Sequence, residues 1–426
     1  MKSLNILHNN QLVGNLKLID NSDEFVFAYD DTWIKNGFAL APSLPLNQII
    51  DQKKARNFIE NLLPEGQSLD ELIYRFNLSK NNYYSIIEAI GSETTGALTF
   101  SANLNNKELT SFREIPFEEL SQRIANRRNT PLLVWDDKPR ISIAGVQEKL
   151  VLCIIDNKYG LASGNLASTH ILKFEKYEQD LVLNEFISLQ LAKLSGLDIP
   201  NIEIIKFNDE QVLKVQRFDR KVISNTQVQR LHIIDMCQVQ GVPVSFKYER
   251  PYGNNESTKD IRNGISFKNI FDSISFTKIP ITQKKKIIDW VIVNLCLGNC
   301  DAHGKNISFF VQSNGKLELT PFYDIVNIQI YKDKYSTELA MGFYDEFDIN
   351  NLKAYDFIEF CIENNINIKA FKERFFTISN KMLKNINSFD LKKFDLDDIT
   401  NNNFLDNYKK DCVNRINKLI NNIELI

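Results

Sequence analysis

The stretch that decides the fold runs from residue 297 to 324 and reads LGNCDAHGKNISFFVQSNGKLELTPFYD. An apolar pattern of helical period ends at its first glycine, which can take the left-handed conformation that closes a helix. A polar loop follows, and then two strand-like pieces, Ile307–Val311 and Leu317–Leu319, are separated by the pair Asn314-Gly315. Asn-Gly between apolar segments is a strong signal for a tight β-hairpin turn. The stretch therefore predicts a helix, a loop and a hairpin in that order.

Three oxygen-bearing side chains in this stretch have the spacing of a phosphoryl-transfer site. Transfer from ATP needs an acceptor for the proton of the attacking hydroxyl and a metal clamp on the phosphates. In kinase-like folds a loop aspartate accepts the proton, and an asparagine five residues later and an aspartate beyond a hairpin hold the metal. Asp301, Asn306 and Asp324 match that order. An Asp and an Asn five apart also arise by chance in an Asn-rich chain, where a solvated turn is the alternative.

The segments upstream of this stretch support the kinase interpretation. From about residue 139 the pattern is β: RISIAG, KLVLCII, a DNKYG turn and THILKF. Lys173 lies in the last of these, and Glu185 follows twelve residues later on a helix. In kinases a strand lysine holds phosphate oxygens and a helix glutamate holds the lysine. The alternative for Lys173 is an ordinary edge-strand residue.

A phosphate loop is the least obvious part of the pattern. ISIAGVQEKL contains a single glycine, Gly145, between two strand-like pieces, so the chain has no GxGxxG here. Backbone N–H groups of residues 144–147 can nevertheless face phosphates if the loop forms an anion-binding nest.

Further elements follow from periodicity and turn signals. The first 105 residues read as a small α+β unit with an Asn9-Asn10 turn. Its strands and helices are predicted at Leu12–Ile19, Glu24–Tyr29, Ala55–Leu63, Ser68–Phe76 and Asn82–Ile90. A helix is expected at Asn184–Ser195 with Gly196 as its stop, followed by the strands NIEIIKF and QVLKVQRF. After about residue 219 the helical period dominates apart from one short hairpin, with a helix at Gln283–Leu297 capped by Thr282 and a polar loop at Tyr252–Asn263.

Bulk composition narrows the class of protein. The chain has 426 residues, of which 43% are hydrophobic, and a formal net charge of -3. That length suggests two or three folded units, and the charge excludes a global positive field that would draw the chain to nucleic acid or membranes. No run of eighteen apolar residues and no signal-peptide core occurs. We expect a globular, cytoplasmic protein.

Six cysteines lie mostly within apolar runs. This pattern suits buried thiols in a reducing compartment better than a disulfide framework. Cys296, Cys300 and His303 have some resemblance to a zinc site, but three ligands are one short and Cys296 lies in a helical apolar pattern.

Six strings, in order along the chain, resemble the successive motifs of the HipA family, the kinase toxins of bacterial toxin–antitoxin pairs. They are RISIAGVQEKL, STHILKF, VQRFDR, DMCQVQGVPVSFKYE, GNCDAHGKN and LTPFYD, and GSETTGALTF ends a segment similar to the family's N-terminal subdomain. The resemblance implies an α+β, protein-kinase-like two-lobe fold with an additional small N-terminal α+β subdomain. It implies three parts: this subdomain at 1–105, a β-rich kinase N-lobe at 106–218 and a mainly helical C-lobe at 219–426.

The resemblance also assigns roles to residues, with ATP and Mg²⁺ as cofactors. Asp301 is the expected catalytic base, Asn306 and Asp324 the expected metal ligands, and Ser142 the expected autophosphorylation site. Glu185 is the expected partner of the phosphate-binding lysine. The expected ATP-binding residues are Ala144, Gly145, Val146, Gln147, Glu148, Lys149, Lys173, Gln216, Arg217, Phe218, His303, Lys305 and Tyr323. Gln216 stands where the family usually has Glu, a change that a hinge acting through its main chain tolerates.

By the same resemblance, the chain is expected to be a serine/threonine protein kinase that inhibits translation and growth by phosphorylating a host protein, such as an aminoacyl-tRNA synthetase. A helix-turn-helix antitoxin similar to HipB is its expected partner, and operator DNA is reached through that antitoxin. Lys372, Arg374, Lys381 and Lys384 are candidates for phosphate-backbone contacts or an ordinary solvated helix face. The alternatives are a small-molecule kinase of the aminoglycoside or choline type, suggested by His303 two residues after the base, and a catalytically silent corepressor subunit.

Overall fold

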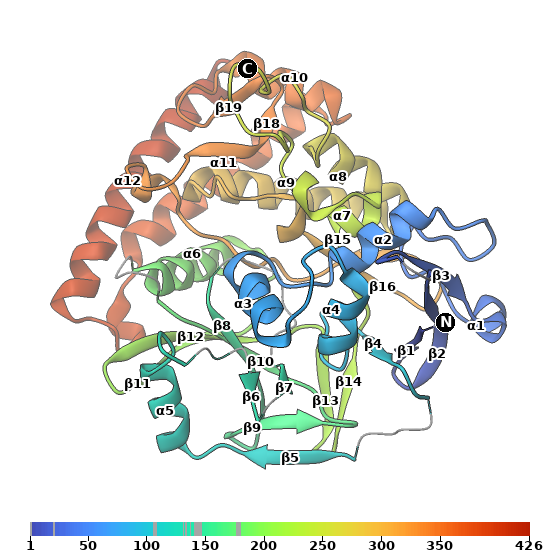
Figure 1. Ribbon diagram of the computed structural model, residues 1–426. Coiled ribbons are helices and arrows are strands. Elements are labelled where there is room, and N and C mark those ends of the chain that lie inside the picture. The colour runs from blue at the N-terminus through green and yellow to red at the C-terminus, as the bar shows by residue number, and fades with distance from the viewer. Residues whose placement is uncertain are drawn as a thin grey trace. The chain divides into compact units, whose positions relative to one another are not determined.

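The computed structural model describes residues 2–19, 22–104, 109–130, 132, 134–136, 138–139, 147–175 and 180–426. The chain divides into two compact units (Figure 1). Unit 1 comprises Met1–Tyr177, Pro200–Val244 and Phe309–Thr320, and unit 2 comprises Glu178–Ile199, Ser245–Ser308 and Pro321–Ile426. In the part of the chain that the structure describes, none of the helices combines the length and apolar character needed to cross a membrane.

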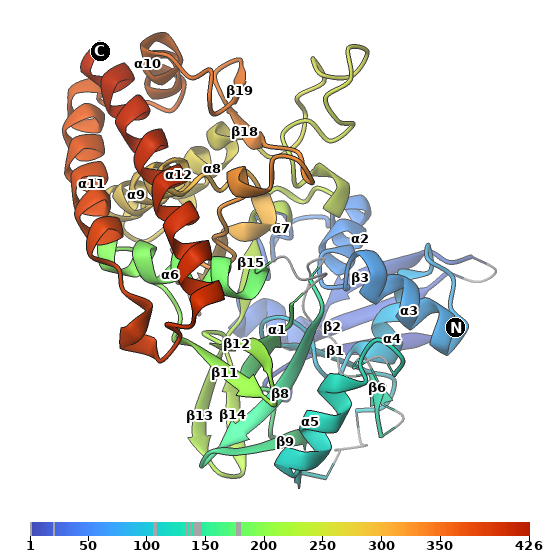
Figure 2. The ribbon, with the colours of Figure 1, turned by 90° about the vertical axis from the view of Figure 1, so that its left-hand side faces the viewer.

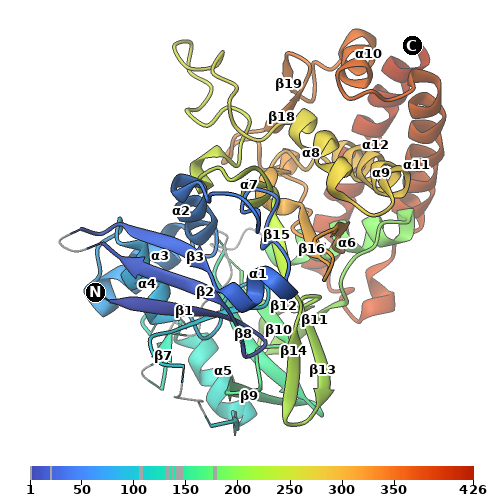
Figure 3. The ribbon, with the colours of Figure 1, turned by 90° about the vertical axis from the view of Figure 1, so that its right-hand side faces the viewer.

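The first part of unit 1 is an antiparallel sheet with four helices. The sheet has the order β3-β2-β1-β4, with bounds Phe25–Tyr29, Gln11–Leu18, Ser3–His8 and Leu98–Ser101. Figure 3 shows β3, β2 and β1 side by side. The helices are α1 (Asp31–Asn36), α2 (Gln52–Glu60), α3 (Gly66–Phe76) and α4 (Tyr83–Ile90). Asn9 and Asn10 both have positive φ and join β1 to β2, which confirms the predicted turn. Asparagine tolerates this conformation because its short side chain bonds locally.

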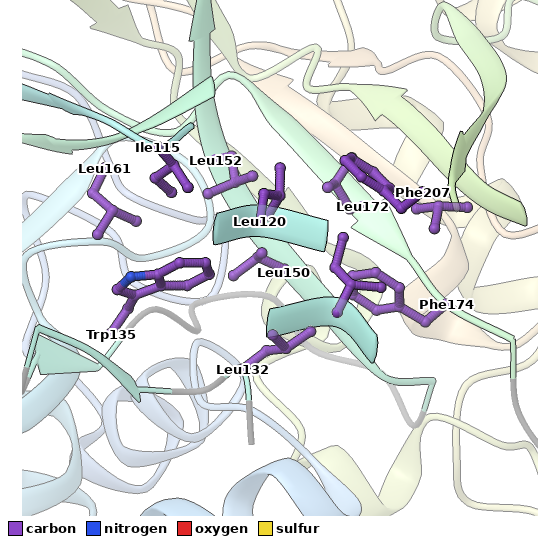
Figure 4. Packing of buried hydrophobic residues seen from close by; sticks show 12 residues of the cluster. Ile115, Leu120, Leu132, Trp135, Leu150, Leu152, Leu161, Leu172, Phe174 and Phe207 are labelled. Atoms are coloured by element: carbon purple, nitrogen blue, oxygen red, sulfur yellow. The ribbon is translucent and has the colours of Figure 1, made fainter. Parts of the chain in front are cut away.

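The second sheet of unit 1 is larger and fully antiparallel. Its order is β11-β12-β10-β8-β9-β5, with bounds Ile202–Phe207, Glu210–Gln216, His170–Lys173, Lys149–Ile155, Lys158–Ser163 and Ser111–Glu114. Helix α5 (Phe117–Ala125) packs on it, and two short strands, β6 (Val134–Trp135) and β7 (Lys138–Pro139), pair with each other. Leu120 from α5, Leu150 and Leu172 from the central strands, and Trp135 are buried together in one apolar core (Figure 4). Burying these side chains supplies the main free energy that holds this sheet to its helix.

Smaller elements complete unit 1. Strands β13 (Arg220–Ser224) and β14 (Gln227–Arg230) form a hairpin, and helix α7 covers Met236–Gln240. Strand β15 (Ile233–Asp235) pairs with β16 (Ser308–Val311), which pairs with β17 (Leu317–Leu319). Gly315 has a φ of 75° in the turn of this last hairpin, which confirms the predicted hairpin and its Asn-Gly turn. A short 3₁₀ helix, Val244–Phe246, begins at the last residue of this part of unit 1 and continues into unit 2.

Unit 2 is mainly helical. Its helices are α6 (Leu181–Ser195), α8 (Phe267–Ser273), α9 (Pro280–Leu297), α10 (Ala354–Glu363), α11 (Ile368–Ser388) and α12 (Ile399–Glu424). Strands β18 (Glu338–Phe343) and β19 (Glu346–Asp348) form a hairpin, and 3₁₀ helices lie at Ile274–Phe276, Gly304–Asn306, Gln329–Tyr331 and Leu391–Phe394. The long helices α11 and α12 run alongside each other (Figure 2). Helix α9 is buried around most of its circumference over its last nine residues, which makes it the central element of this unit.

Two predictions about elements are wrong. The helix expected to begin at Gln283 begins at Pro280, with Ile279 rather than Thr282 at its N-cap. Proline suits the first helical position because its missing N–H would be unpaired there in any case. The prediction of a single hairpin after residue 219 is also wrong, since β13–β14 and β18–β19 form two more. The first strand of the β13–β14 hairpin gives little signal, because β13 is exposed at four of its five residues. The predicted strand RISIAG lies largely outside the described residues.

Candidate active site

The loop that carries Asp301 begins at a fixed point in unit 2. Gly298 ends α9 with a φ of 72°, and its N–H donates to the carbonyls of Asn294 and Leu295. A Cβ at this glycine would lie 2.5 Å from the guanidinium of Arg415 on α12. The positive φ and the close approach together explain why glycine stands here.

The loop is held in shape by its own hydrogen bonds. The main-chain carbonyl of Asp301 accepts from the N–H of His303 and from Nδ2 of Asn306, both at 2.8 Å. The N–H of Asn306 donates to the carbonyl of His303 at 2.9 Å. Because Nδ2 of Asn306 is used in this way, its Oδ1 is the amide atom left to accept a ligand. The carboxylate of Asp301 is exposed, and its Oδ1 accepts a hydrogen bond from the hydroxyl of Tyr248 at 2.7 Å.

Two further predicted residues, His303 and Lys305, lie buried in the same loop. Nδ1 of His303 accepts from the N–H of Lys305 at 3.3 Å. The ring of His303 meets the ring of Tyr248 edge to face, with centroids 5.1 Å apart. These contacts tie the residues after the aspartate to a segment more than fifty positions upstream.

Tyr323 and Asp324 lie after the hairpin and within unit 2. The hydroxyl of Tyr323 donates to the carbonyl of Lys305 at 2.8 Å and lies 2.5 Å from Oγ of Ser308. Asp324 follows with a φ of 53°, a left-handed conformation that is uncommon for a residue with a side chain. Nonglycine residues in this conformation cluster at functional sites, where the surrounding structure imposes it. The structure thus brings Tyr323 into contact with the loop that carries Asp301.

Apart from Glu185, the other candidates that the structure describes lie in unit 1. Lys149 on β8 and Lys173 on β10 are directly opposite each other across the two strands, and both are buried. Opposite residues of an antiparallel pair project to the same face, so this face carries two cations at neighbouring positions. Gln147 precedes the strand and donates from Nε2 to the carbonyl of Phe174 at 2.9 Å. Nε of Arg127 donates to Glu148 at 3.1 Å, and burial raises the pKa of that carboxyl against the effect of the arginine.

The predicted hinge joins the end of β12 to a buried charge cluster. The N–H groups of Gln216 and Arg217 donate to the carbonyls of Asn201 and Thr169, both at 2.9 Å. In this conformation these N–H groups are therefore used in main-chain hydrogen bonds within unit 1. The ring of Phe218 contacts that of Phe310 edge to face, with centroids 6.1 Å apart. Whether main-chain groups of the hinge meet adenine stays a prediction.

The charge cluster comprises Glu93, Arg217, Asp219, Arg220 and Arg230, all in unit 1. Arg217 donates to both carboxylate oxygens of Asp219 at 2.9 and 2.7 Å, and Arg220 donates to the same group at 2.6 Å. Glu93 pairs with Arg220 at 3.3 Å and accepts from Ser168. The cluster therefore joins the GSETTG string to the VQRFDR string.

The remaining predicted residues are placed as follows. Glu185 is buried on α6 in unit 2, whereas Lys173 belongs to unit 1. Ser142, Ala144, Gly145 and Val146 lie outside the described residues. Of the basic residues considered for DNA, Arg374 forms a bidentate pair with Asp289 and Lys372 donates to carbonyls at the end of the chain.

Sequence reasoning missed Tyr248. It lies in the string DMCQVQGVPVSFKYE, to which the resemblance gave no chemical role, and its hydrogen bond to Asp301 spans 53 residues. No local spacing signals such a contact. The buried thiols of Cys296 and Cys300 were expected, and all six cysteines are free and buried. Among the described residues, no three His, Cys, Asp or Glu side chains gather as ligands for a metal ion.

Comparison with known proteins identifies the family. Residues 4–101 match the family described as HipA N-terminal domain, and residues 141–388 match the HipA-like C-terminal domain. The chain belongs to the HipA family. It is 42% identical over 350 residues to the serine/threonine-protein kinase toxin HipA of Shewanella oneidensis, covering 82% of this chain and 80% of the toxin.

A solved structure of HipA with HipB and operator DNA, from Shewanella oneidensis, matches the fold with a TM-score of 0.88. The match has 36% identity and covers 99% of this chain and 98% of that chain. The predicted fold class is therefore confirmed: the chain has the α+β, kinase-like two-lobe fold of HipA.

Proposed function

We propose that this HipA family member is an ATP-dependent serine/threonine protein kinase. The observation that carries the proposal is the loop after α9. There the carboxylate of Asp301 is exposed, and the side-chain amide of Asn306 is held by the hydrogen bond from its Nδ2 to the main-chain carbonyl of Asp301. This loop supplies a proton acceptor and a metal ligand five residues apart, as phosphoryl transfer requires.

In the proposed mechanism, Asp301 orients the acceptor hydroxyl and accepts its proton as the phosphoryl group moves. The amide oxygen of Asn306 and the carboxylate of Asp324 are both hard oxygen donors, the kind that Mg²⁺ prefers. They would hold the ion, which when bound neutralises charge on the nucleotide phosphates. Lys149 and Lys173 give the β8–β10 face a positive character that suits the same phosphates.

The finer assignments are part of the same proposal. Residues 144–149 form the phosphate loop, Glu185 holds Lys173, and residues 216–218 form the hinge. Ser142 is an autophosphorylation site that controls the phosphate loop. The division into parts at 1–105, 106–218 and 219–426 belongs to this scheme as well.

We also propose a HipB-like, helix-turn-helix antitoxin as partner, with operator DNA bound through it. The Shewanella structure contains HipA together with HipB and operator DNA, which supports this assembly for a chain of the same fold. The near-neutral charge of this chain suits a protein that reaches DNA through a partner. The proposed substrate is a host protein such as an aminoacyl-tRNA synthetase, whose phosphorylation slows translation.

The test is Asp301→Asn in the full chain, assayed with γ-labelled ATP and Mg²⁺ for self-labelling and for transfer to lysate proteins. Phosphoryl transfer is expected to fall by about 10²-fold or more, because the amide cannot accept a proton. Thermal stability should stay unchanged, since the side chain is exposed and the amide oxygen can still accept from Tyr248.

Asp272→Asn is the matched control, because Asp272 is an exposed aspartate on α8 of the same unit, paired only with the surface residue Lys268 among the described residues. Normal turnover of a folded Asp301→Asn protein would remove Asp301 from its role. Absence of ATP turnover by the wild-type chain would favour the silent corepressor, and transfer to a small aminoalcohol instead of protein would favour the small-molecule kinase.

A further inference from the structure

A phenol group donates directly to the carboxylate proposed as the base. The hydroxyl of Tyr248 lies 2.7 Å from Oδ1 of Asp301, and among the described residues no other side chain donates to this carboxylate. A hydrogen bond to a charged acceptor is shorter and stronger than one between neutral groups. With Oδ1 engaged, the carboxylate cannot rotate freely, and Oδ2 becomes the oxygen that faces an incoming hydroxyl.

The main chain on one side of Tyr248 is bonded to the catalytic loop itself. The carbonyl of Lys247 accepts from the N–H of Gly304 at 2.8 Å. Gly304 has no side chain, and a Cβ there would lie 2.8 Å from the side chain of Ile265, which follows the same upstream segment. The tyrosine and the aspartate are therefore carried by backbones that touch each other.

The main chain on the other side is bonded to β18. The N–H of Glu249 donates to the carbonyl of Ala340 at 3.0 Å, and its Oε2 accepts from the N–H of Gly342 at 2.8 Å. Arg262 donates to Oε1 of the same buried carboxylate at 2.6 Å. Glu249 therefore clamps the tyrosine's backbone to a strand.

The ring itself has little freedom. It packs edge to face against His303 with an interplanar angle of 88°. Tyrosine has only two side-chain torsions, so ordering it costs less conformational entropy than ordering a longer polar side chain. A rigid ring on a doubly anchored backbone delivers the hydroxyl to one place.

We propose that Tyr248 is a positioning residue for the proton-accepting carboxylate: it fixes the rotation of Asp301 so that Oδ2 meets the acceptor hydroxyl. This inference rests on the proposed kinase function. Tyr248 touches neither nucleotide nor acceptor in this scheme. Removing its hydroxyl therefore slows the chemical step and leaves the affinity for nucleotide unchanged. Misorientation of a catalytic group by about 1 Å can cost about 10²-fold in rate.

One rival explanation makes the opposite prediction. A phenol bonded to the base occupies a position that resembles that of an acceptor hydroxyl, so Tyr248 could block the site. Removing the hydroxyl would then raise the rate of transfer. The two explanations differ in the sign of one measurement.

The experiment compares Tyr248→Phe with the wild type and with Tyr252→Phe in the full-length protein. Tyr252 lies in the following loop, has an exposed ring and makes no described contact with Asp301, so it controls for the loss of a phenol hydroxyl nearby. Phosphoryl transfer gives kcat and the KM for ATP, calorimetry gives affinity for an ATP analogue with Mg²⁺, and thermal unfolding reports on the fold.

For Tyr248→Phe we expect kcat to fall about 10- to 100-fold, with KM, analogue affinity and melting temperature close to wild type. Tyr252→Phe should match the wild type throughout. An unchanged or increased kcat would overturn the inference, as would a rise in KM at constant kcat or a parallel loss of analogue binding. If the wild type is active and Asp301→Asn is inactive while Tyr248→Phe is normal, only this inference fails. Inactive wild type would instead mean failure of the proposed function.

Discussion

At the scale of single residues, Asp219 supplies negative charge that compensates the arginines of the buried charge cluster. Burial alone would raise the pKa of Asp219, but Arg217 and Arg220 together outweigh burial and hold that pKa well below its usual range. Both arginines are buried with it, and Asp219 and Glu93 together compensate their charges. Removing one partner of a buried ion pair leaves an uncompensated charge, which costs far more than a surface pair contributes.

We therefore expect Asp219→Asn to lower the free energy of unfolding by about 3–5 kcal/mol. Urea unfolding of the purified chain, followed by circular dichroism, measures this loss. Asp209→Asn is the control, because Asp209 is an exposed aspartate in the β11–β12 turn of the same unit. Equal stability of the two variants would show that the cluster contributes little.

The same variant tests the pH dependence. The folded-state pKa of Asp219 lies below its unfolded value, so its contribution is present above the unfolded pKa of about 4 and is lost as pH falls towards the folded one. The wild type should lose stability on acidification below about pH 4, and Asp219→Asn should show a shallower loss in that window. A parallel decline in both proteins would contradict the assignment.

At the scale of elements, the segment before α8 depends on a close approach of two backbones. A Cβ at Gly264 would lie 1.9 Å from the carbonyl oxygen of Tyr248, a distance that no rotamer change relieves. Gly264→Ala is expected to push the tyrosine segment away from the catalytic loop and reduce kcat at least as much as Tyr248→Phe. Steady-state transfer assays measure this reduction.

Gly253→Ala is the matched control in the same loop. Gly253 has a φ of 84°, but nothing lies within 4 Å of its added Cβ, so this change costs only the backbone strain of about 1–2 kcal/mol locally. We expect near-normal kcat for Gly253→Ala. Equal activity of both variants would mean that the position of the segment does not matter for catalysis.

The sequence predicted those helix ends and turns that depend on the conformational preference of a single residue. Gly196 and Gly298 stop their helices as expected, each with positive φ, and the Asn314-Gly315 turn closes the hairpin after the loop that carries Asp301. The start of α9 was misplaced, because a threonine that can cap competed with a proline that suits the first turn. The β13–β14 hairpin was missed because β13 is exposed at four of its five residues and so lacks a buried alternation.

In the candidate site, too, features set by local sequence could be predicted, and features set by tertiary contacts could not. The spacing of Asp301, Asn306 and Asp324 could be read from the sequence because one loop and one hairpin carry them. The contact of Tyr248 with Asp301 could not, since it arises from tertiary packing of two separate segments. The cluster around Asp219 was missed for the same reason: its charges come from strings more than one hundred residues apart.

At the scale of the whole molecule, all six cysteines are buried and free. Burial raises the pKa of Cys153 to about 12 and that of Cys300 to about 11, so neither thiol forms a thiolate near neutral pH. The thiolate is the reactive species. We expect a thiol-specific reagent at pH 8 to leave the native protein unmodified and to label all six cysteines in urea, as counted by mass spectrometry. Rapid labelling of the native chain would contradict the buried placement.

The charge cluster restricts how this chain can be recombined with its relatives. Arg220 donates to the carbonyls of Thr94 and Gly96, and the N–H of Gly96 donates to Asp219 at 2.9 Å. A chimera that took its first hundred residues from another family member would inherit a foreign partner for these buried charges. The graft would be tolerated only if the donor brought an equivalent of Glu93 and a glycine at position 96, where φ is 75°. The N-terminal segment therefore cannot be exchanged on its own between family members. A working chimera must take the GSETTG and VQRFDR strings from the same parent.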